Sequence, residues 1–281
     1  APGAPAEDGR RRRNPKAFAA AAGAVLVAAG IGVGIGAAIA PVSPAAAARN
    51  TVEEAVAAAK AAGTYHYVQI SSTDGTVDEI VGDATATGGT QVITTGQQRY
   101  TLRLIGGVVY FKGNASAVAG QLGASAGVAA RYAGRWVAIT AKNGASFYKT
   151  FEEGITTSSN LAEIDQDMDP TAVHHGTVDG RAVVEVTGPL IIGGGVPPSG
   201  TATLLLAAGS HRPLSLDGRA TVQGVTITDE WTFSHYGESV RVARPAGAVP
   251  YARLGATPPA SSSAQGLGQG PRDEATQAAP G

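Results

Sequence analysis

Residues 123–127 have a spacing that could carry covalent catalysis. They read Gly-Ala-Ser-Ala-Gly, which matches the G-x-S-x-G pattern in which hydrolases present a nucleophilic serine. That pattern works only when a strand precedes the serine and a helix follows it. The residues just before it, 117–122, predict a helix instead, and a chain rich in Ala, Ser and Gly produces such a match easily. We therefore interpret Ser125 as part of a turn between two helices, and a hydrolase is the weakest functional hypothesis.

Two groups of residues could bind a metal ion, and neither has the required pattern. Asp165, Asp167 and Asp169 alternate like the first ligands of a calcium loop, but Pro170 stands where that loop needs Gly and its twelfth position is not Glu. A solvated acidic loop before a strand is the better interpretation. The neighbouring pair His174-His175 would point to opposite faces of a strand, so the two rings could not share one ion. No metal site is expected.

Other chemistry is excluded by composition. The chain has no Cys, which excludes disulfides, thiolate metal sites and cysteine nucleophiles. The glycines at 193–195 lack the Lys-Ser/Thr of a phosphate loop, and the segment 188–200 is interpreted as a mobile loop. Net charge is −1, and beyond residue 16 the basic residues are scattered, so no nucleic-acid partner is expected. We expect a protein that is not an enzyme and has no cofactor.

The elements that must position any site begin with a hydrophobic segment at residues 17–40. Its 24 residues carry no charge, and as a helix they would extend roughly 36 Å, enough for a hydrocarbon core of about 30 Å. The basic run 10–16 precedes it, which predicts a disordered cytoplasmic head at 1–16 and an extracytoplasmic C-terminal side. We expect a single-pass cell-membrane protein. The alternative is a signal peptide cleaved near Ala48, after which the protein would be secreted.

Glycines within this hydrophobic segment could mediate association. Gly30, Gly32, Gly34 and Gly36 give two overlapping G-x-x-x-G spacings, which let two membrane helices approach closely. A weak homodimer through the transmembrane helix is one interpretation. Compositional bias in a Gly-rich chain is the other.

Beyond the membrane segment, the sequence predicts one folded domain. Residues 41–49 are expected to be a linker, 50–245 an extracytoplasmic domain, and 246–281 a disordered tail of Pro, Ala, Ser, Gly and Gln. The pattern Thr-Val-Glu-Glu from Thr51 predicts the start of a helix that ends at Gly63.

The period of the hydrophobic pattern then changes to two, which is typical of strands. Short Gly-containing turns separate the first runs, so these are expected to form an antiparallel meander. Helical patterns follow, around Val118 and Leu122 and at Phe147, Phe151 and Ile155. A second group of strands completes the domain. The expected strands are 65–70, 77–85, 91–95, 100–104, 108–112, 135–139, 176–178, 182–187, 201–207, 212–216, 220–228, 231–234 and 240–243. This order predicts an α+β fold with a large antiparallel sheet and helices against one face.

Five segments of the domain resemble one family in order and spacing. They are GVVYFKGN (107–114) followed by GRWVAIT (134–140), HHGTVDGRAVVEVTG (174–188), TATLLLAAGSHRPLSLD (201–217) and ITDEWTFSHYGESVRVARP (227–245). Together they resemble the actinobacterial LppX/LprAFG lipoproteins, relatives of the LolA-type lipoprotein carriers. The resemblance implies a half-open β-barrel, that is, one curved antiparallel sheet with helices across its concave face. It also implies an apolar cavity for the acyl chains of a lipid or glycolipid, and no catalysis.

One departure from that family concerns anchoring. Its members are tethered by a lipidated Cys, which this chain lacks, so the segment 17–40 would serve as the anchor. Local lipid presentation, sensing or a structural role then fits better than long-range carriage. The ligand-binding candidates are Val109 and Phe111 on one strand face, with Val118 and Leu122 on a covering helix, and ordinary core is the alternative for each. The competing functional hypothesis is a ligand-free interaction or sensor domain that acts through a protein partner.

Overall fold

A computed structural model describes residues 43–191 and 199–255 of the chain. The predicted membrane segment 17–40 and its glycine pattern lie outside the described residues. Within the described ranges, no helix combines the length and apolar character needed to cross a bilayer.

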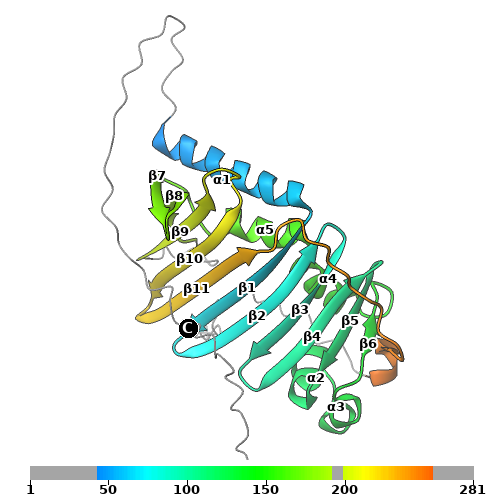
Figure 1. Ribbon diagram of the computed structural model, residues 1–281. Helices are drawn as coiled ribbons and strands as arrows, with labels where there is room; N and C mark the ends of the chain where they lie inside the picture. The colour runs from blue at the N-terminus through cyan, green and yellow to red at the C-terminus, as the bar shows by residue number, and fades with distance from the viewer. Residues whose placement is uncertain (1–42, 192–198, 256–281) are drawn as a thin grey trace, which may run out of the picture. The chain divides into compact units, whose positions relative to one another are not determined.

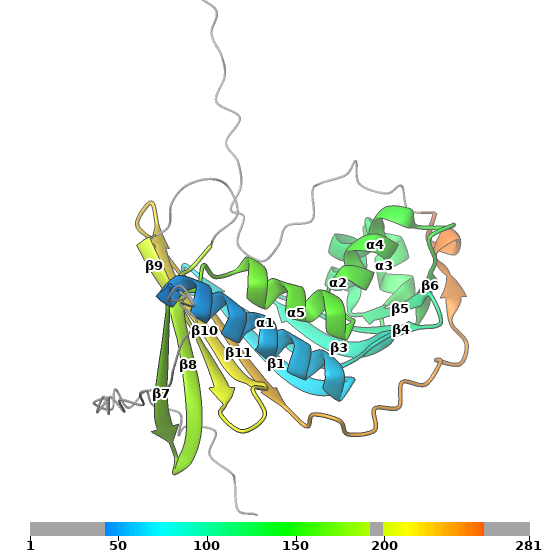
Figure 2. The ribbon, with the colours of Figure 1, turned by 90° about the horizontal axis from the view of Figure 1, so that it is seen from above.

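The described residues form one 12-stranded sheet, which is curved and does not close (Figures 1 and 2). The strand order is β12-β6-β5-β4-β3-β2-β1-β11-β10-β9-β8-β7, so β1 lies in the middle and joins the two halves of the domain. Neighbouring strands are antiparallel except β12 and β6. The strands are β1 (Thr64–Thr73), β2 (Thr76–Thr85), β3 (Gly88–Thr95), β4 (Gln98–Ile105), β5 (Val108–Gly113), β6 (Val137–Ile139), β7 (Ala172–Val178), β8 (Arg181–Pro189), β9 (Ser199–Ala207), β10 (Pro213–Val222), β11 (Val225–Ser234) and β12 (Val249–Pro250).

The helices form two groups that pack against the sheet (Figure 2). One group is the long α1 with α5, and the other is three short helices inserted after β5 and around β6. The bounds are α1 (Pro44–Ala62), α2 (Ala115–Leu122), α3 (Ala126–Tyr132), α4 (Ala145–Glu153), α5 (Thr157–Gln166) and a final 3₁₀ turn η1 (Tyr251–Leu254). The expected α+β class, with a large curved and unclosed antiparallel sheet carrying helices, is thereby confirmed.

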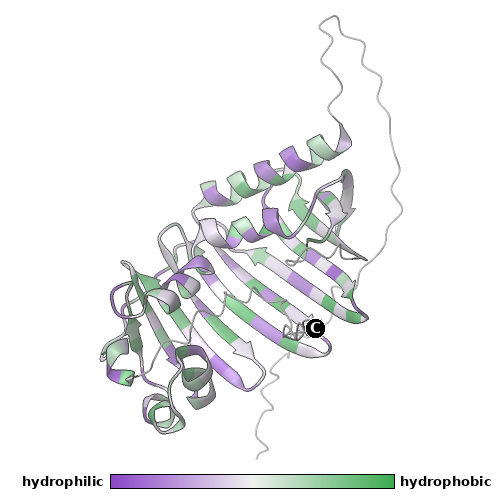
Figure 3. Ribbon diagram, turned by 180° about the vertical axis from the view of Figure 1, so that it is seen from behind, coloured by the Kyte–Doolittle hydropathy of each residue, from purple (hydrophilic) through white to green (hydrophobic). Residues whose placement is uncertain are grey.

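The strand register places one row of buried side chains on the helix-covered face. Tyr67 lies opposite Phe233 on one side and Gly82 on the other, and the same row continues through Gln91 to Leu102. Successive side chains of a strand alternate between the two faces of the sheet. The residues that precede and follow each member of this row in its own strand therefore point away from the helices. The alternation is visible as bands along the strands in Figure 3.

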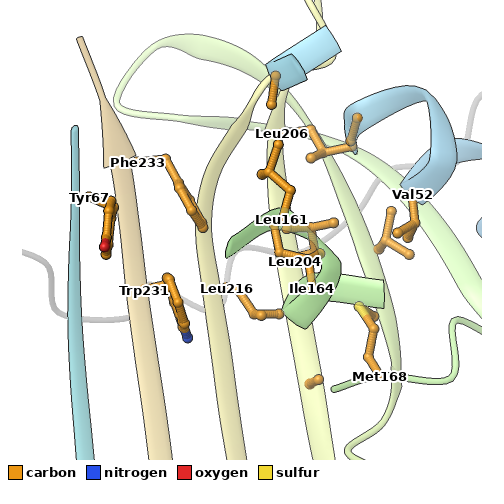
Figure 4. Packing of buried hydrophobic residues seen from close by; sticks show 14 of the residues in the cluster. Val52, Tyr67, Leu161, Ile164, Met168, Leu204, Leu206, Leu216, Trp231 and Phe233 are labelled. Atoms are coloured by element: carbon orange, nitrogen blue, oxygen red, sulfur yellow. The ribbon is translucent and has the colours of Figure 1, made fainter. Parts of the chain in front are cut away.

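Beneath the helices, the apolar core is divided into two clusters. The α1–α5 cluster joins the small residues of α1 to α5 and to the strands around β11, as Figure 4 shows for Val52, Leu161 and Trp231. The α2–α4 cluster joins the three short helices and η1 to β3–β6. Burial of apolar surface in these two clusters is the main force holding the helices on the sheet.

Helix α1 begins earlier than the sequence predicted. It starts at Pro44 rather than near Thr51, so most of the segment 41–49 that was expected to be a linker is helical. The Ser43 side chain accepts a hydrogen bond from the backbone N–H of Ala46, and proline is favoured in a first helical turn. The alanines of residues 45–48 therefore extend the helix, and Ala48 is fully buried.

Three predictions for the C-terminal third are wrong. The expected strands 220–228 and 231–234 are instead parts of two long strands, because Gln223 and Gly224 both adopt positive φ and form a tight hairpin turn. Residues 240–243 form no strand, since β11 is already paired on both sides by β1 and β10 and offers no free edge.

The third error concerns the tail expected from residue 246. Residues 249–254 instead form β12 and η1, and Tyr251 and Leu254 are buried in the α2–α4 cluster. The folded unit therefore ends later than predicted.

Candidate functional site

All four residues predicted to contact a ligand lie together in the α2–α4 cluster. Val109 and Phe111 are on the covered face of β5, and Val118 and Leu122 are on the inner face of α2. None of the four has exposed surface. Their role as ligand contacts stays a prediction, and a lipid chain would reach them only if the short helices move.

Helix α2 is placed over β5 by Asn114, the residue that immediately precedes the helix. Asn114 follows β5 directly and caps α2 from the position just before it: its side-chain oxygen accepts a hydrogen bond from the Ala117 N–H at 2.9 Å, and its side-chain nitrogen donates to the Gln97 carbonyl at 2.8 Å. Asparagine is favoured at this position because it satisfies a backbone donor that the helix leaves unpaired. These two bonds fix the start of α2 against the β3–β4 turn.

The ring contacts of Phe111 are aromatic. Its ring stacks on Tyr100 at a centroid distance of 5.2 Å and lies 5.9 Å from the Phe151 ring of α4. These rings give Phe111 a hydrocarbon-like environment.

A polar strip that the sequence did not predict crosses the covered face between the two clusters. Gln91 is buried, and its side-chain nitrogen donates to the Tyr67 hydroxyl and to the Gly154 carbonyl. Asn160 of α5 donates to the same carbonyl at 3.0 Å. These bonds link β1, β3 and α5. They also give the buried polar side chains the hydrogen-bond partners that such groups need.

Asp229 of β11 lies at one end of this strip. Its carboxylate accepts hydrogen bonds from the Gln69 amide at 3.0 Å, the Ser71 hydroxyl at 2.7 Å and the Trp231 ring N–H at 2.7 Å. These three bonds fix the position of the Asp229 carboxylate on the covered face.

Two further carboxyl groups, one on α5 and one on the residue that follows it, have raised pKa values. Burial, followed by the negative charges of Asp167 and Asp229, raises the pKa of Glu163 to about 8. Burial and the charge of Asp229 likewise raise the pKa of Asp167 to about 7. Both groups are consequently protonated over part of the neutral pH range.

The two raised pKa values predict that stability falls as pH rises. Because the folded-state pKa values exceed the ordinary values of 4.5 and 3.8, both carboxyls bind protons more tightly in the folded protein. Their stabilising contribution is full below these ordinary values and is lost as pH rises through 7 and 8. We expect a loss of roughly 3 kcal/mol from about pH 5 to about pH 9, after allowing for partial exposure.

Urea unfolding across this pH range measures the effect. The double variant Glu163→Gln, Asp167→Asn should have a flatter profile than the wild type, and Asp165→Asn, at an exposed position of the same helix, should leave the profile unchanged. A wild-type profile that rises from neutral to alkaline pH would contradict the assignment.

The residues with catalytic or metal-binding spacing are not assembled into such a site. Ser125 is exposed and precedes α3, after helix α2 has ended at Gly123, which confirms the predicted turn between two helices. His174 and His175 alternate on the exposed strand β7. Within the described ranges, no group of three or more His, Cys, Asp or Glu side chains could hold a metal ion.

The acidic alternation at residues 165–169 does not form the solvated loop that was expected. Asp165 belongs to α5, Asp167 is half-buried, and Asp169 forms an ion pair with Arg49 of α1 at 2.8 Å. The helical pattern of Leu161 and Ile164 continues through Gln166, which explains the difference.

A sequence signal for the polar strip does exist. Gln69 and Gln91 interrupt alternating runs at positions where the pattern requires a buried residue, and Asn160, Glu163 and Asp167 recur at the spacing of one helix face. Each feature alone is weak. Together they indicate polar side chains on a covered surface.

Comparisons with known proteins identify no family. No protein-family model and no curated protein matches the chain. Among solved structures it is similar to MucB, with a TM-score of 0.36, 14% identity, and coverage of 70% of this chain and 61% of that one. A DUF1329 family protein from Desulfovibrio piger has a TM-score of 0.31, 11% identity, and coverage of 71% and 95%. A LolA superfamily protein from Nitrosomonas europaea has a TM-score of 0.26, 10% identity, and coverage of 69% and 94%.

These matches carry little weight for function. The chain spans about 61% of the length of MucB, the first of the similar structures, and all three TM-scores are too low to establish a common fold. The architecture therefore rests on the structure itself, which defines an α+β protein with one open sheet covered by helices.

Proposed function

We propose that this chain is a non-catalytic, membrane-anchored extracytoplasmic protein that binds or presents a lipid or glycolipid. The observation that carries the proposal is the α2–α4 cluster, in which three short helices cover β3–β6 through buried aromatic and aliphatic contacts. The sequence resemblance to the LppX/LprAFG lipoproteins supports the same assignment. The hydrophobic segment 17–40 would supply the anchor and the location.

The short helices are suited to opening over such a ligand. α2, α3 and α4 have 8, 7 and 9 residues, and helices of this length are marginal without the surface on which they pack. An acyl chain that replaced their contacts with Val109 and Phe111 would itself bury apolar surface, at ~0.8 kcal/mol per CH₂. Lipid uptake then exchanges one apolar contact for another, and the sheet beneath remains in place.

Photo-crosslinking with a diazirine-labelled fatty acid tests this proposal on the full chain. We expect labelled peptides to include residues 109–122, because the predicted contacts of β5 and α2 lie there. Val118→Phe should reduce this labelling, since a larger side chain on the inner face of α2 would compete with an acyl chain for the apolar surface of β5, whereas Val178→Phe, at an exposed position of β7, should not. Circular dichroism of both variants checks that they remain folded.

Labelling confined to residues outside the α2–α4 cluster, or labelling unchanged in Val118→Phe, would contradict the proposal. A chain that takes up no fatty acid and yields no lipid on extraction would favour the second candidate, a ligand-free interaction domain.

One observation favours that candidate. β7 ends the sheet and pairs only with β8 among the described strands, so its outer edge offers backbone groups to an extended partner segment.

A further inference from the structure

Charge is distributed unevenly along the chain. Residues 84–151 contain no Asp or Glu, and neither do residues 239–255. These two stretches form β3–β6, α2, α3, most of α4, β12 and η1, which together make one half of the domain. Their basic residues are Arg99, Arg103, Lys112, Arg131, Arg135, Lys142, Lys149, Arg241, Arg244 and Arg253. The chain as a whole has a net charge of −1, so this half carries a local excess of positive charge.

Strands β4 and β5 present part of this charge on the face of the sheet that no helix covers. Arg99 and Arg103 alternate with the buried residues of β4, so their side chains point away from the helices. Lys112 follows the buried Phe111 on β5 and pairs with Thr101, which lies between the two arginines on β4. Three cations of two neighbouring strands therefore share one face.

Trp136, just before β6, brings two of these cations together. The guanidinium carbon of Arg103 lies 4.8 Å from the centre of the Trp136 ring, and the ammonium nitrogen of Lys112 lies 5.8 Å from it. Aromatic rings attract cations in this position. The charges of β4 and β5 are thus held close together at the β6 end of the sheet.

The segment that leads from β11 to β12 adds two more cations (Figure 2). The Arg103 side chain donates a hydrogen bond to the Ala243 carbonyl at 3.1 Å, which places this segment beside the same strands. Arg241 and Arg244 lie on either side of Ala243 in the sequence, and both are exposed. We call the five cations the basic face: Arg99, Arg103, Lys112, Arg241 and Arg244.

No carboxylate of the described residues neutralises the basic face. The ion pairs within the described ranges involve other cations. Glu79 and Asp83 of β2 point to the same side of the sheet, but β3 separates them from β4 by about 10 Å. Asp83 also contacts His66 at 2.9 Å. An anionic partner is the missing complement.

We propose that the basic face docks on the anionic headgroups of a phospholipid bilayer. Each Lys or Arg near such a surface strengthens docking by a factor of about five. The five cations are spread over two strands and a connecting segment, so they form an open surface rather than a pocket. A fluid bilayer suits this surface because its headgroups move laterally until they meet the charges.

The basic face suits a bilayer better than a nucleic acid. Proteins that bind single strands stack bases on free aromatic rings. The Trp136 ring is instead already in contact with Arg103 and Lys112. The choice of a bilayer over an acidic protein rests on the proposed function, which holds the domain beside a membrane, whereas the anionic character of the partner does not.

Docking and the proposed lipid site use opposite faces of the same strands. Phe111 points into the α2–α4 cluster, and Lys112, the next residue of β5, points to the uncovered face. A docked domain therefore keeps α2, α3 and α4 on the side away from the headgroups. The short helices remain free to open while the sheet rests on the bilayer.

Lysine acetylation of the purified full chain, followed by mass spectrometry, tests the proposal. The chain is compared in vesicles of phosphatidylcholine and in vesicles of phosphatidylcholine mixed with phosphatidylglycerol. Lys112 should react at least about fivefold more slowly with phosphatidylglycerol present, because its ammonium group contacts the headgroups. Lys60 of α1 and Lys149 of α4, both exposed outside the basic face, should react equally in the two. Salt at about 1 M should remove the protection of Lys112.

Two double variants with equal loss of charge make the test specific. Arg99→Gln with Arg244→Gln keeps Lys112 as the reporter and should weaken docking at least about tenfold, so that most of its protection is lost. Arg181→Gln with Arg219→Gln removes two exposed charges from β8 and β10 and should leave the protection unchanged.

Folding of the variants is checked separately. The melting temperature of each double variant shows whether it is folded. Should Arg99→Gln disturb β4, Arg241→Gln with Arg244→Gln, outside every strand, should give the same loss of protection.

Three results would overturn the proposal. They are equal acetylation of Lys112 in the two kinds of vesicle, equal protection of Lys60 and Lys149, and equal loss in the variants of β4 and of β8–β10. Protection of Lys112 by polyglutamate or by a single-stranded oligonucleotide, but not by phosphatidylglycerol, would overturn the bilayer as the partner. Absence of fatty-acid labelling at residues 109–122 would bear on the lipid site alone, because docking uses the opposite face.

Discussion

Replacing Phe111 by Ala should lower the free energy of unfolding by ~3–5 kcal/mol, the usual cost of removing a buried phenyl ring. Phe111 has no exposed surface and connects β5 to Tyr100 on β4 and to Phe151 on α4. The shortened side chain would leave a cavity where strand and helix meet, and the rigid sheet could not collapse to fill it. Chemical unfolding in urea, with the midpoint and slope fitted separately, measures the loss.

The control for this prediction is Val77→Ala. Val77 is also an apolar strand residue, but 54% of it is exposed, so its shortening should change stability by ~0.5 kcal/mol or less. Comparable losses in the two variants would mean that the α2–α4 cluster is not packed as described.

Ending the chain after Ala248 should have an effect at least as large. This deletion removes β12, which pairs with β6, and η1, whose Tyr251 and Leu254 are buried in the α2–α4 cluster. The Tyr251 ring lies 5.3 Å from the Phe147 ring of α4, and its hydroxyl donates to the Leu122 carbonyl of α2 at 3.4 Å. Two large buried side chains are lost together, so we expect ~5 kcal/mol or more.

Amide hydrogen exchange shows where this loss occurs. α2 and α4 should exchange faster in the shortened chain, whereas α1 and α5, which pack in the other cluster, should change little. A chain ending at Gly255 is the matched control, because it keeps every contact described for β12 and η1. Equal stability of the two shortened chains would refute the role assigned to this terminal segment.

Much of the sheet could be predicted because its strands obey local rules. The meander β1–β5 alternates between buried and exposed positions and turns at Gly-containing pairs such as Asp74-Gly75, where both residues adopt positive φ. The short helices could be predicted from the spacing of Val118 with Leu122 and of Phe147 with Phe151. Each of these signals lies within a few residues of chain.

The elements that were mispredicted depend on distant contacts. Tyr251 and Leu254 stand in a segment of Pro, Ala and Gly that resembles a disordered tail, and only the α2–α4 cluster, formed more than 100 residues earlier, gives them a partner. The expected strand at 240–243 failed for the converse reason, since β1 already occupies the edge of β11 that it needed.

The candidate sites divide in the same way. The burial of Val109 and Phe111 follows from strand alternation alone. The polar strip does not, because it brings Gln69 and Asp229 together across the β1–β11 pair, 160 positions apart in the sequence. A lone Gln in a strand, or a lone Glu on a short helix, does not indicate a polar strip until the pairing of β1 with β11 is known.

The central place of β1 has a consequence for how this protein is made. A chain that leaves the ribosome presents β1 early, yet its neighbour β11 follows about 160 residues later, and β12 later still. Until then one edge of β1 is bare, and an unpaired edge invites association with other chains. Synthesis of this protein therefore calls for protection of the first half of the sheet until the last strands have emerged from the ribosome.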